Sequence, residues 1–304
     1  MQNKEYLFSI IVPTYNRASF LPNTIESVIN QSNANWELII VDDGSTDNTS
    51  TIIQPYIDSD KRIKYIYQDN AERSVARNNG TEHATGLYII CLDSDDLLQE
   101  KHLQGLSEFI SKNSTPVSLI VSGYKILSER TTELPVFPDF GNNLVEYFFL
   151  YPVIPARTCI HIDILKEFKY HPNITIVEDS ILFSEISTKY PILRNENQTV
   201  YYNLHEDNSI NIKNFSAIKR LNGLKIFFKT KTSDNLSVSL KKELIFDCYY
   251  KIGLSYKYHN KLSKGSSFFL KAILTNPRGS KIKSATFEFL SCFKIFRIIW
   301  KDLK

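Results

Sequence analysis

The sequence predicts an α/β fold, with a mostly parallel sheet flanked by helices and followed by a smaller all-helical C-terminal region. Two observations support this prediction. The first hundred residues alternate short, nearly continuous apolar runs with segments of helical periodicity, which is typical of a parallel sheet covered on both faces. From about residue 215 the pattern changes to long helical segments. We therefore expect two domains, at residues 1–214 and 215–304.

Four apolar runs in the first hundred residues predict buried strands, and each is followed by a segment with the spacing or the start signals of a helix. Open sheets of this kind bind ligands beyond the carboxyl ends of their strands, so the residues there are candidate site residues. The expected strands are Phe8–Val12, Trp36–Val41, Arg62–Tyr67 and Leu87–Leu92, and the expected helices are Ala18–Asn30, Thr46–Tyr56, Ser74–Ala84 and Leu97–Ser111.

The rest of the chain gives a coarser pattern. It predicts further strands and short helices up to about residue 214, and then four long helices. The expected strands are Ser118–Tyr124 and Thr199–Leu204, and the expected short helices are Asn142–Leu150, Ile162–Phe168 and Val177–Lys189. The expected long helices are Phe215–Lys231, Leu236–Tyr258, Leu262–Leu274 and Ile282–Lys301.

The composition is that of an ordinary globular protein, with 304 residues, 42% of them hydrophobic and 23% charged. The four cysteines are far apart and form no C-x-x-C, which favours reduced thiols over a disulfide framework or a zinc site. No secretory signal is visible, and no stretch reaches the ~20 apolar residues that span a bilayer. We expect a cytoplasmic protein that can associate peripherally with the inner face of the plasma membrane.

Three carboxylates gather in the run Asp93-Ser94-Asp95-Asp96, directly after the apolar strand that ends at Leu92. Like charges repel, so a cation is expected to offset them there. A hard divalent ion such as Mg²⁺ or Mn²⁺ takes oxygen ligands and often shares them with substrate phosphates. The alternative is that Asp96 caps the helix that follows and that the other two carboxylates are solvated.

Four motifs occur in an ordered series along the first half of the chain. Together they closely resemble the family 2 glycosyltransferases of the GT-A fold over roughly the first hundred residues, and the resemblance extends to about Ser209. The motifs are Ser9-Ile10-Ile11-Val12-Pro13-Thr14-Tyr15-Asn16, Val41-Asp42-Asp43-Gly44-Ser45-Thr46-Asp47, Ala76-Arg77-Asn78-x-Gly80 and Leu92-Asp93-Ser94-Asp95-Asp96.

The resemblance implies an inverting, metal-dependent transfer of one sugar from a nucleotide-sugar donor, usually a UDP-sugar, to an acceptor hydroxyl. It implies a role for each of the matching residues. For the nucleotide, Pro13, Thr14 and Tyr15 would line the uridine pocket, Asp42 would bind the uracil or ribose with support from Asp43, and Arg77 would reach the base or diphosphate. Asp93, Ser94 and Asp95 would form the D-x-D element on the ribose and the metal, and His205 would bind metal or diphosphate. Asp179 would be the general base beside Glu178.

These residues also have ordinary structural interpretations. Asp42 can be a turn residue, Tyr15 a core residue, Arg77 a solvated helix residue, and Asp179 an acidic residue in a first helical turn. The family's Asn-x-Gly segment after the third strand is here Asn70-Ala71-Glu72, which leaves the path of that loop open. A nucleotidyltransferase and a non-catalytic nucleotide-binding relative are the alternative functions. The Q-x-x-R-W element of processive synthases is absent, which favours addition of a single sugar.

The C-terminal region is strongly basic. Residues 215–304 hold 19 Lys and Arg against 5 Asp and Glu, whereas residues 1–214 hold 17 against 28. An amphipathic stripe of Ala285, Phe289, Phe293, Phe296 and Trp300 can face a protein core or an anionic membrane that carries a lipid-linked glycan acceptor. No recognised nucleic-acid motif accompanies the charge, so we expect no nucleic-acid partner.

Overall fold

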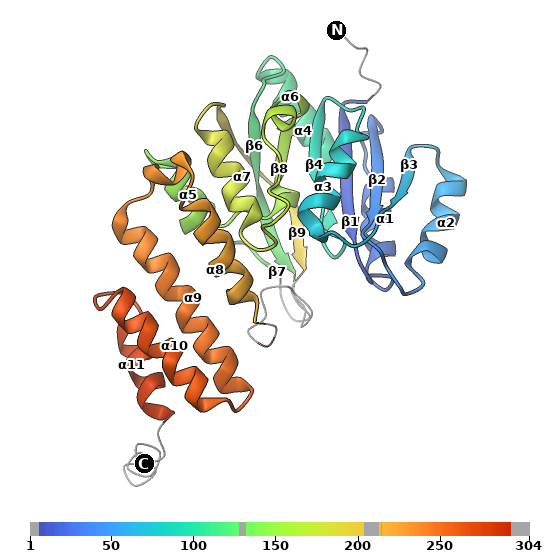
Figure 1. Cartoon of the computed structure of the whole chain (residues 1–304). Helices are drawn as coiled ribbons and strands as arrows, with labels where there is room; N and C mark the ends of the chain where they lie inside the picture. Colours follow the sequence, from blue (N-terminus) through green and yellow to red (C-terminus); the bar gives the residue numbers. More distant parts are fainter. Residues whose placement is uncertain (1–5, 128–131, 204–212, 214, 293–304) are drawn as a thin grey trace. The chain divides into compact units, whose positions relative to one another are not determined.

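The computed structural model describes residues 6–127, 132–203, 213 and 215–292 (Figure 1). The chain forms two compact units. The first, called the sheet unit below, comprises Met1–Asn173 and Glu178–His205, and the second, called the helical unit, comprises Ile174–Val177 and Glu206–Lys304. Sequence periodicity did not indicate that the short segment 174–177 belongs with the C-terminal helices.

Parallel strands form the N-terminal half of the sheet, as the sequence predicts. Strands β1 (Phe8–Thr14), β2 (Trp36–Asp42) and β4 (Tyr88–Cys91) are buried along their whole length, and β3 (Ile63–Tyr67) lies at the edge beside β2. Within the described residues the strand order is β3-β2-β1-β4-β8-β6-β9-β5, with β7 paired to β6. The connecting helices are α1 (Leu21–Ile29), α2 (Thr49–Ser59) and α3 (Glu72–Glu82).

The second half of the sheet is mixed. The short strand β8 lies between β4 and β6 and is antiparallel to both, whereas β6 and β9 form a long parallel ladder. Strand β8 was not predicted from the sequence, because it is only four residues long. The elements in chain order are β5 (Leu97–Leu98), α4 (His102–Lys112), β6 (Leu119–Leu127), β7 (Thr132–Glu133), α5 (Leu144–Leu150), η1 (Pro155–Arg157), β8 (Thr158–His161), α6 (Ile162–Glu167), α7 (Glu178–Ser187) and β9 (Ile192–Asn203).

The predicted helix at Leu97–Ser111 is wrong in its first turn. Leu97 and Leu98 form β5, which pairs with Tyr201 and Val200 of β9, and the helix begins only at His102. A strand partner about a hundred residues away in the sequence therefore overrides the local helical pattern, as long-range pairing commonly does.

Alternation along the strands builds a hydrophobic core on each face of the sheet. In β1, Phe8, Ile10 and Val12 pack on one face with the apolar side chains of α1 and α4, and Ile11 packs on the other with those of α3, α5 and α7. Both faces are thus covered, as the buried strands require. The α/β prediction is confirmed.

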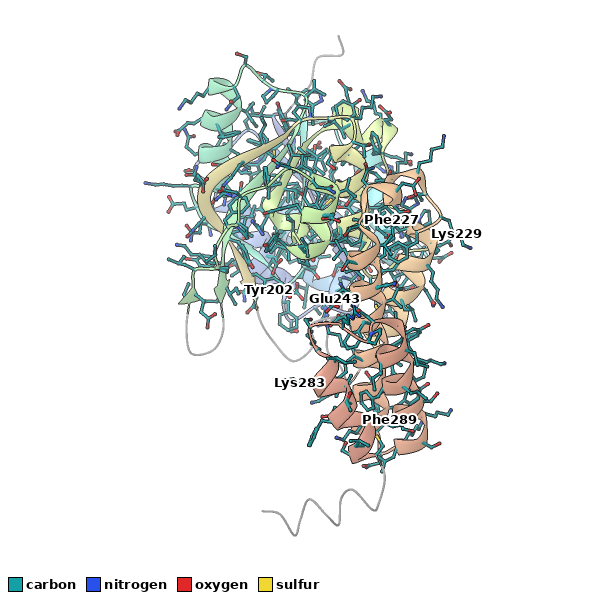
Figure 2. All side chains as sticks on the ribbon, turned by 90° about the vertical axis from the view of Figure 1, so that its left-hand side faces the viewer. Tyr202, Phe227, Lys229, Glu243, Lys283 and Phe289 are labelled. Atoms are coloured by element: carbon teal, nitrogen blue, oxygen red, sulfur yellow. The ribbon has the colours of Figure 1, made fainter. Side chains whose placement is uncertain are left out.

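The helical unit contains α8 (Ser216–Phe227), η3 (Lys231–Asn235), α9 (Val238–Tyr258), α10 (Leu262–Thr275) and α11 (Ile282–Ser291). A Cβ on Gly253 would meet the ring of Phe269 at 2.6 Å, so this glycine lets α9 and α10 pack closely. Phe246, Ala272 and Ala285 form a core between α9, α10 and α11. Figure 2 labels Phe227 on α8, Glu243 on α9 and Phe289 on α11. The predicted stripe beyond residue 292 lies outside the described residues. Within the described part of the chain, no helix is long and apolar enough to cross a membrane.

Candidate active site

The carboxyl ends of β1, β2 and β3 meet in register at one edge of the sheet. Thr14 pairs with Asp42, and Asp42 pairs with Tyr67. Pro13 is buried within β1, whereas Tyr15, the first residue beyond the strand, is 48% exposed. The Thr14 hydroxyl is buried and has no hydrogen-bond partner among the described residues. The strand end therefore presents an exposed aromatic ring next to an unsatisfied polar group.

Asp42 and Asp43 are both buried and both shape loops. The Asp42 carboxylate accepts hydrogen bonds from the Ser45 backbone N–H at 2.8 Å and from the Tyr65 hydroxyl at 2.8 Å. Asp43 accepts from the backbone N–H of Ala71 at 2.9 Å. Asp42 thus makes the contacts that are expected if it is a turn residue. Its binding of a nucleotide remains a prediction.

The loop that lacks the family's glycine still adopts a left-handed conformation. Glu72, at the position of that glycine, has φ 70°, which is uncommon for a residue with a side chain. The loop is fixed from the other side by Gly44, where φ is 82° and a Cβ would lie 2.9 Å from the Asn70 backbone nitrogen. The Asn70 side chain also donates to the Asp43 carbonyl at 2.9 Å. These contacts hold the loop in its conformation without a glycine at position 72.

The acidic run after β4 is held in a tight turn. The Thr24 hydroxyl donates to the backbone carbonyls of Ser94 and Asp96 at 2.9 and 3.0 Å, and the Asp96 N–H donates to the Asp93 carbonyl at 3.0 Å. Ser94 is buried, so its backbone geometry is fixed by the protein. Because α1 supplies Thr24, this helix positions the whole turn.

Asp96 does not cap a helix, contrary to the sequence-based interpretation. It is 1% exposed, and its carboxyl accepts a hydrogen bond from the Asn203 backbone N–H of β9 at 3.1 Å. Burial, together with the neighbouring Asp93 and Asp95, raises the pKa of Asp96 well above the usual aspartate range. Its Oδ2 atom is buried and has no partner among the described residues. The turn thus holds more acidic groups than it can keep ionised without a further positive charge.

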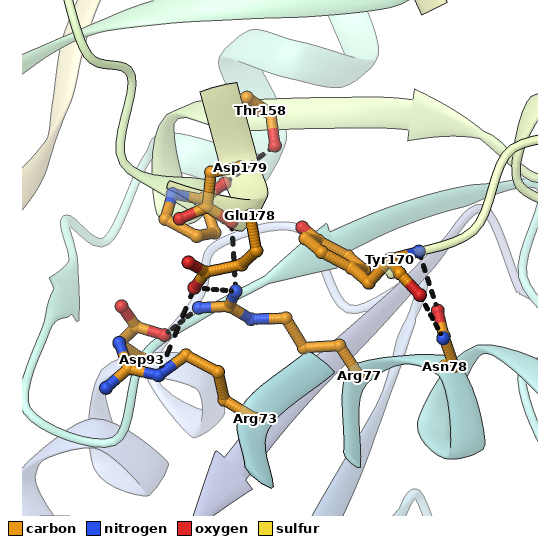
Figure 3. A network of polar contacts seen from close by, with 9 residues as sticks. Arg73, Arg77, Asn78, Asp93, Thr158, Tyr170, Glu178 and Asp179 are labelled. Atoms are coloured by element: carbon orange, nitrogen blue, oxygen red, sulfur yellow. Dashed lines mark hydrogen bonds and ion pairs between the residues drawn. The ribbon is translucent and has the colours of Figure 1, made fainter. Parts of the chain in front are cut away.

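Arg77 of α3 joins this turn to the start of α7 (Figure 3). Its guanidinium is fully buried and donates to Asp93 at 2.7 Å, to Glu178 at 3.0 Å and to Asp179 at 2.9 Å. Arg73, one turn earlier, lies 3.9 Å from Glu178. The interpretation of Arg77 as a solvated helix residue is therefore wrong. Its ion pairs are to carboxylates, and its contact with a base or diphosphate remains a prediction.

Two residues behind Arg77 were not recognised as part of the site from the sequence. The Tyr170 ring lies against the guanidinium, with 5.1 Å between Arg77 Cζ and the ring centroid. The Asn78 side chain donates to the Tyr170 carbonyl at 2.8 Å and accepts from the Tyr170 N–H at 3.0 Å (Figure 3). Asn78 lay in a recognised motif, whereas nothing in the sequence marked Tyr170. The glycine of that motif, Gly80, packs α3 onto the sheet, because a Cβ there would lie 2.5 Å from Ile11.

Two of the three acids that Arg77 contacts differ in the direction of their pKa shift. Burial alone would raise the pKa of Asp93, but Arg77 and Arg73 bring it below the usual value. Burial raises the pKa of Asp179 well above the usual aspartate range, although Arg77 opposes the shift. Asp93 is thus kept as an anion, and Asp179 is suited to take up a proton.

The residue directly before the helix that carries Asp179 is strained. Val177 has φ 74°, a conformation that is a genuine outlier for a β-branched side chain. Such strain costs on the order of 1–3 kcal/mol and is concentrated at functional sites. The segment directly before Glu178 and Asp179 is therefore held in place by its surroundings.

The donor chemistry of the turn fits a hard cation. Carboxylate oxygens of Asp93, Asp95 and Asp96 are the available type, and Mg²⁺ is commonly held by one or two carboxylates plus substrate phosphates. In the part of the chain that the structure describes, no group of three or more His, Cys, Asp or Glu side chains is arranged to hold a metal. A metal here would thus need ligands from a bound diphosphate. His205, the other predicted metal residue, lies outside the described residues.

Comparison with known proteins gives a consistent result. Residues 9–167 match the sequence model of Glycosyl transferase family 2. WfgD of Escherichia coli, named as a UDP-Glc:alpha-D-GlcNAc-diphosphoundecaprenol beta-1,3-glucosyltransferase, is 30% identical over 215 residues, which are 70% of this chain and 76% of WfgD. TuaG of Bacillus subtilis, named as a glycosyltransferase of teichuronic acid biosynthesis, is 40% identical over 138 residues, which are 45% of this chain and 54% of TuaG.

The matched lengths differ among the relatives. The chain spans about half of TuaG, and it spans 31% and 26% of two uncharacterized glycosyltransferases from Rickettsia felis and Rickettsia bellii. Among solved structures, residues 1–349 of S. aureus TarS in complex with UDP-GlcNAc align with a TM-score of 0.62 at 16% identity, covering 98% of this chain and 92% of that chain. The mannosyltransferase PcManGT from Pyrobaculum calidifontis, in complex with GDP-Man and Mn²⁺, aligns with a TM-score of 0.54 at 16% identity, covering 96% and 82%. These likenesses show the fold and confirm the GT-A prediction.

Proposed function

The chain belongs to glycosyltransferase family 2, and on that basis we propose that it moves one sugar from a UDP-sugar to an acceptor hydroxyl with inversion at the anomeric carbon. One observation carries the proposal. A single buried guanidinium, that of Arg77, bonds both the D-x-D carboxylate Asp93 and the predicted base Asp179. Arg77 thereby fixes the positions of two acids relative to each other, Asp93 for the donor and Asp179 for the acceptor. A direct displacement requires donor and acceptor to be positioned together in this way.

The donor would lie over the strand ends. The exposed Tyr15 ring offers a stacking surface for uracil, the unsatisfied Thr14 hydroxyl a hydrogen bond, and Pro13 and Asp42 the floor of the pocket. Asp93 and Ser94 would bind the ribose. UDP as the nucleotide is supported by the donors in the names of WfgD and of the TarS complex.

We assign the metal to Asp95, with His205 as a second ligand. A bound Mg²⁺ or Mn²⁺ would neutralise the charge that develops on the departing diphosphate. The excess of carboxylates in the turn after β4 and the orphaned Oδ2 of Asp96 support a cation at this place. The Mn²⁺ in the PcManGT complex is consistent with the assignment.

Asp179 would act as the general base. Its side chain is 20% exposed, so an acceptor hydroxyl can reach it, and Arg77 fixes its orientation at 2.9 Å. Its raised pKa suits a group that must accept a proton near neutral pH. Glu178 is 3% exposed and is paired with the same guanidinium. It would still offset the positive charge of Arg77 when Asp179 is protonated.

The acceptor would be a glycan, free or linked to a lipid, in the synthesis of a cell-surface polysaccharide. The names of TuaG and WfgD support this proposal. A membrane-bound acceptor also fits the helical unit, where Phe287 and Leu290 are 41% and 38% exposed and share a helix face with Lys283. Contact of α11 with an anionic membrane would bring the enzyme to such an acceptor.

The experiment that tests the function is a panel of UDP-sugars with and without Mn²⁺, read out by thermal shift and by UDP release. We expect metal-dependent stabilisation by UDP, lost in Asp95→Asn but kept in Asp58→Asn, an exposed aspartate of α2 that serves as the matched control. Full metal-dependent binding and turnover in Asp95→Asn would refute the metal assignment. No UDP release with any donor would refute the proposed transfer.

A further inference from the structure

The helical unit contains a charge cluster that the transfer reaction does not use. Asp247 of α9 accepts from Arg220 of α8 at 2.8 Å, from Lys251 of α9 at 2.8 Å and from Lys281, the residue before α11, at 2.9 Å. These four residues are called the Asp247 cluster. Three cations that come from separate elements thus converge on one carboxylate.

One carboxylate cannot balance three cations. The cluster carries a surplus of two positive charges, and the other acid nearby on α9, Glu243, is bonded to Asn276 and Ser280 in the turn between α10 and α11. Even with Glu243 included, cations exceed carboxylates. Gathering like charges costs free energy unless an anion offsets it. The surplus of negative charge at the acidic turn favours a bound cation, and the surplus of positive charge here favours a bound anion.

The cluster is built by the fold and open to solvent. Glu243 fixes the turn that carries Lys281, and Gly279 in that turn packs so closely that a Cβ would lie 3.0 Å from the Glu243 carboxylate. Asp247 itself is 15% exposed, whereas Lys251 and Lys281 are 41% and 50% exposed. The largely buried Asp247 carboxylate therefore holds the cations in place, while the side chains of Lys251 and Lys281 remain accessible to water.

The chemistry of the cations selects the class of anion. A guanidinium presents several N–H donors in a fork that matches phosphate oxygens, and lysines add mobile point charges. The first turn of α11 begins directly after Lys281, and a helix N-terminus also favours an anion. From these contacts we infer that Arg220, Lys251 and Lys281 form a binding site for a phosphate or diphosphate group. Such a group can belong to a lipid head group or to a water-soluble molecule.

The test is binding of inorganic pyrophosphate to the full-length protein by titration calorimetry at low ionic strength. No divalent metal is added, because pyrophosphate would chelate it and because the proposed donor site needs the metal to bind a diphosphate. The variant Lys251→Gln/Lys281→Gln removes two cations of the cluster, and Lys264→Gln/Lys271→Gln removes two exposed cations of α10 as a control with the same net charge. We expect the first pair to weaken pyrophosphate binding about tenfold or more and the second to leave it nearly unchanged.

Sedimentation with vesicles distinguishes the source of the phosphate. Binding to phosphatidylglycerol vesicles, but not to phosphatidylcholine vesicles, that is lost only in Lys251→Gln/Lys281→Gln would assign the site to a lipid head group. Binding of pyrophosphate without vesicle binding would assign it to a soluble phosphate. Equal losses in both variant pairs, or no binding of either probe by a wild-type protein that still binds UDP, would overturn the inference while leaving the proposed transfer intact.

Discussion

Two charge clusters of opposite composition occur in this protein, one in each unit. In the sheet unit one cation, Arg77, is held by three carboxylates, those of Asp93, Glu178 and Asp179. In the helical unit one carboxylate, that of Asp247, is held by three cations. The cluster around the positive Arg77 therefore has a net negative charge, and the cluster around the negative Asp247 has a net positive charge.

Burial distinguishes the two clusters. Arg77 and Glu178 are 0% and 3% exposed and Asp93 and Asp179 are 29% and 20% exposed, whereas every member of the Asp247 cluster is between 15% and 50% exposed. Buried charges lose their hydration and become strongly dependent on each other, while exposed ones keep water and are screened by salt. The Arg77 cluster is therefore expected to be rigid and essential for folding, and the Asp247 cluster to be adaptable and suited to exchange of a ligand.

The largest expected effect comes from the base. Replacing Asp179 by Asn leaves an oxygen to accept from Arg77 but removes the proton acceptor, so transfer should fall by about 10²–10⁴-fold. UDP binding should be unchanged, because the donor residues are untouched. Rates of UDP release with acceptor, compared with UDP affinity by titration, check both parts. Turnover within a few-fold of wild type would show that another group takes the proton.

The next effect comes from the central cation of the buried cluster. Arg77→Gln leaves three carboxylates around a buried site without their cation, and should lower the free energy of unfolding by about 3–5 kcal/mol. Urea unfolding at neutral pH measures this loss. If Arg77→Gln were as stable as wild type, the buried cluster would not be held together by its charges. Loss of folded protein on expression would agree with the prediction, and Arg77→Lys should then recover part of it.

The sequence was sufficient for the part of the site that depends on strand ends. Buried apolar runs predicted β1, β2 and β4, and the parallel arrangement predicted that Asp42, Asp43, Asp93 and Asp95 would lie at the strand ends on one edge. The strand period and burial determine those positions locally. This is why the acidic turn could be placed before the structure was known.

Contacts between distant segments could not be predicted in the same way. Arg77 meets Asp179 across 102 residues, and Tyr170, whose backbone is bonded to Asn78, lies against Arg77. Leu97 joins β9 instead of a helix for the same reason. The Asp247 cluster likewise depends on how α8, α9 and the turn before α11 pack. The periodicity of a sequence indicates which face of a helix or strand is buried, but it does not indicate which other element packs against that face.

A smaller effect is expected at the exposed cluster. Arg220→Gln leaves Asp247 bonded to Lys251 and Lys281, so the free energy of unfolding should fall by about 1 kcal/mol or less. The same urea experiment that is used for Arg77→Gln gives the comparison directly. A loss as large as that of Arg77→Gln would mean that the Asp247 cluster is a structural core and would weaken the contrast between the two units.

The smallest expected effect is a shift in the pH dependence of transfer. Asp179 must be ionised to act as a base, so kcat/KM should fall as the pH drops through its pKa, which burial places well above the usual aspartate range. Arg73 lowers that pKa, and Arg73→Gln should therefore move the acid limb of the profile to higher pH. The shift should be only a few tenths of a pH unit, because Arg73 is 34% exposed and solvent screens it. Lys61→Gln, an exposed cation that is not among the groups acting on Asp179, is the control. A shift to lower pH in Arg73→Gln would mean that the acid limb reports a different group, and Asp179 would then lose its assignment as the base.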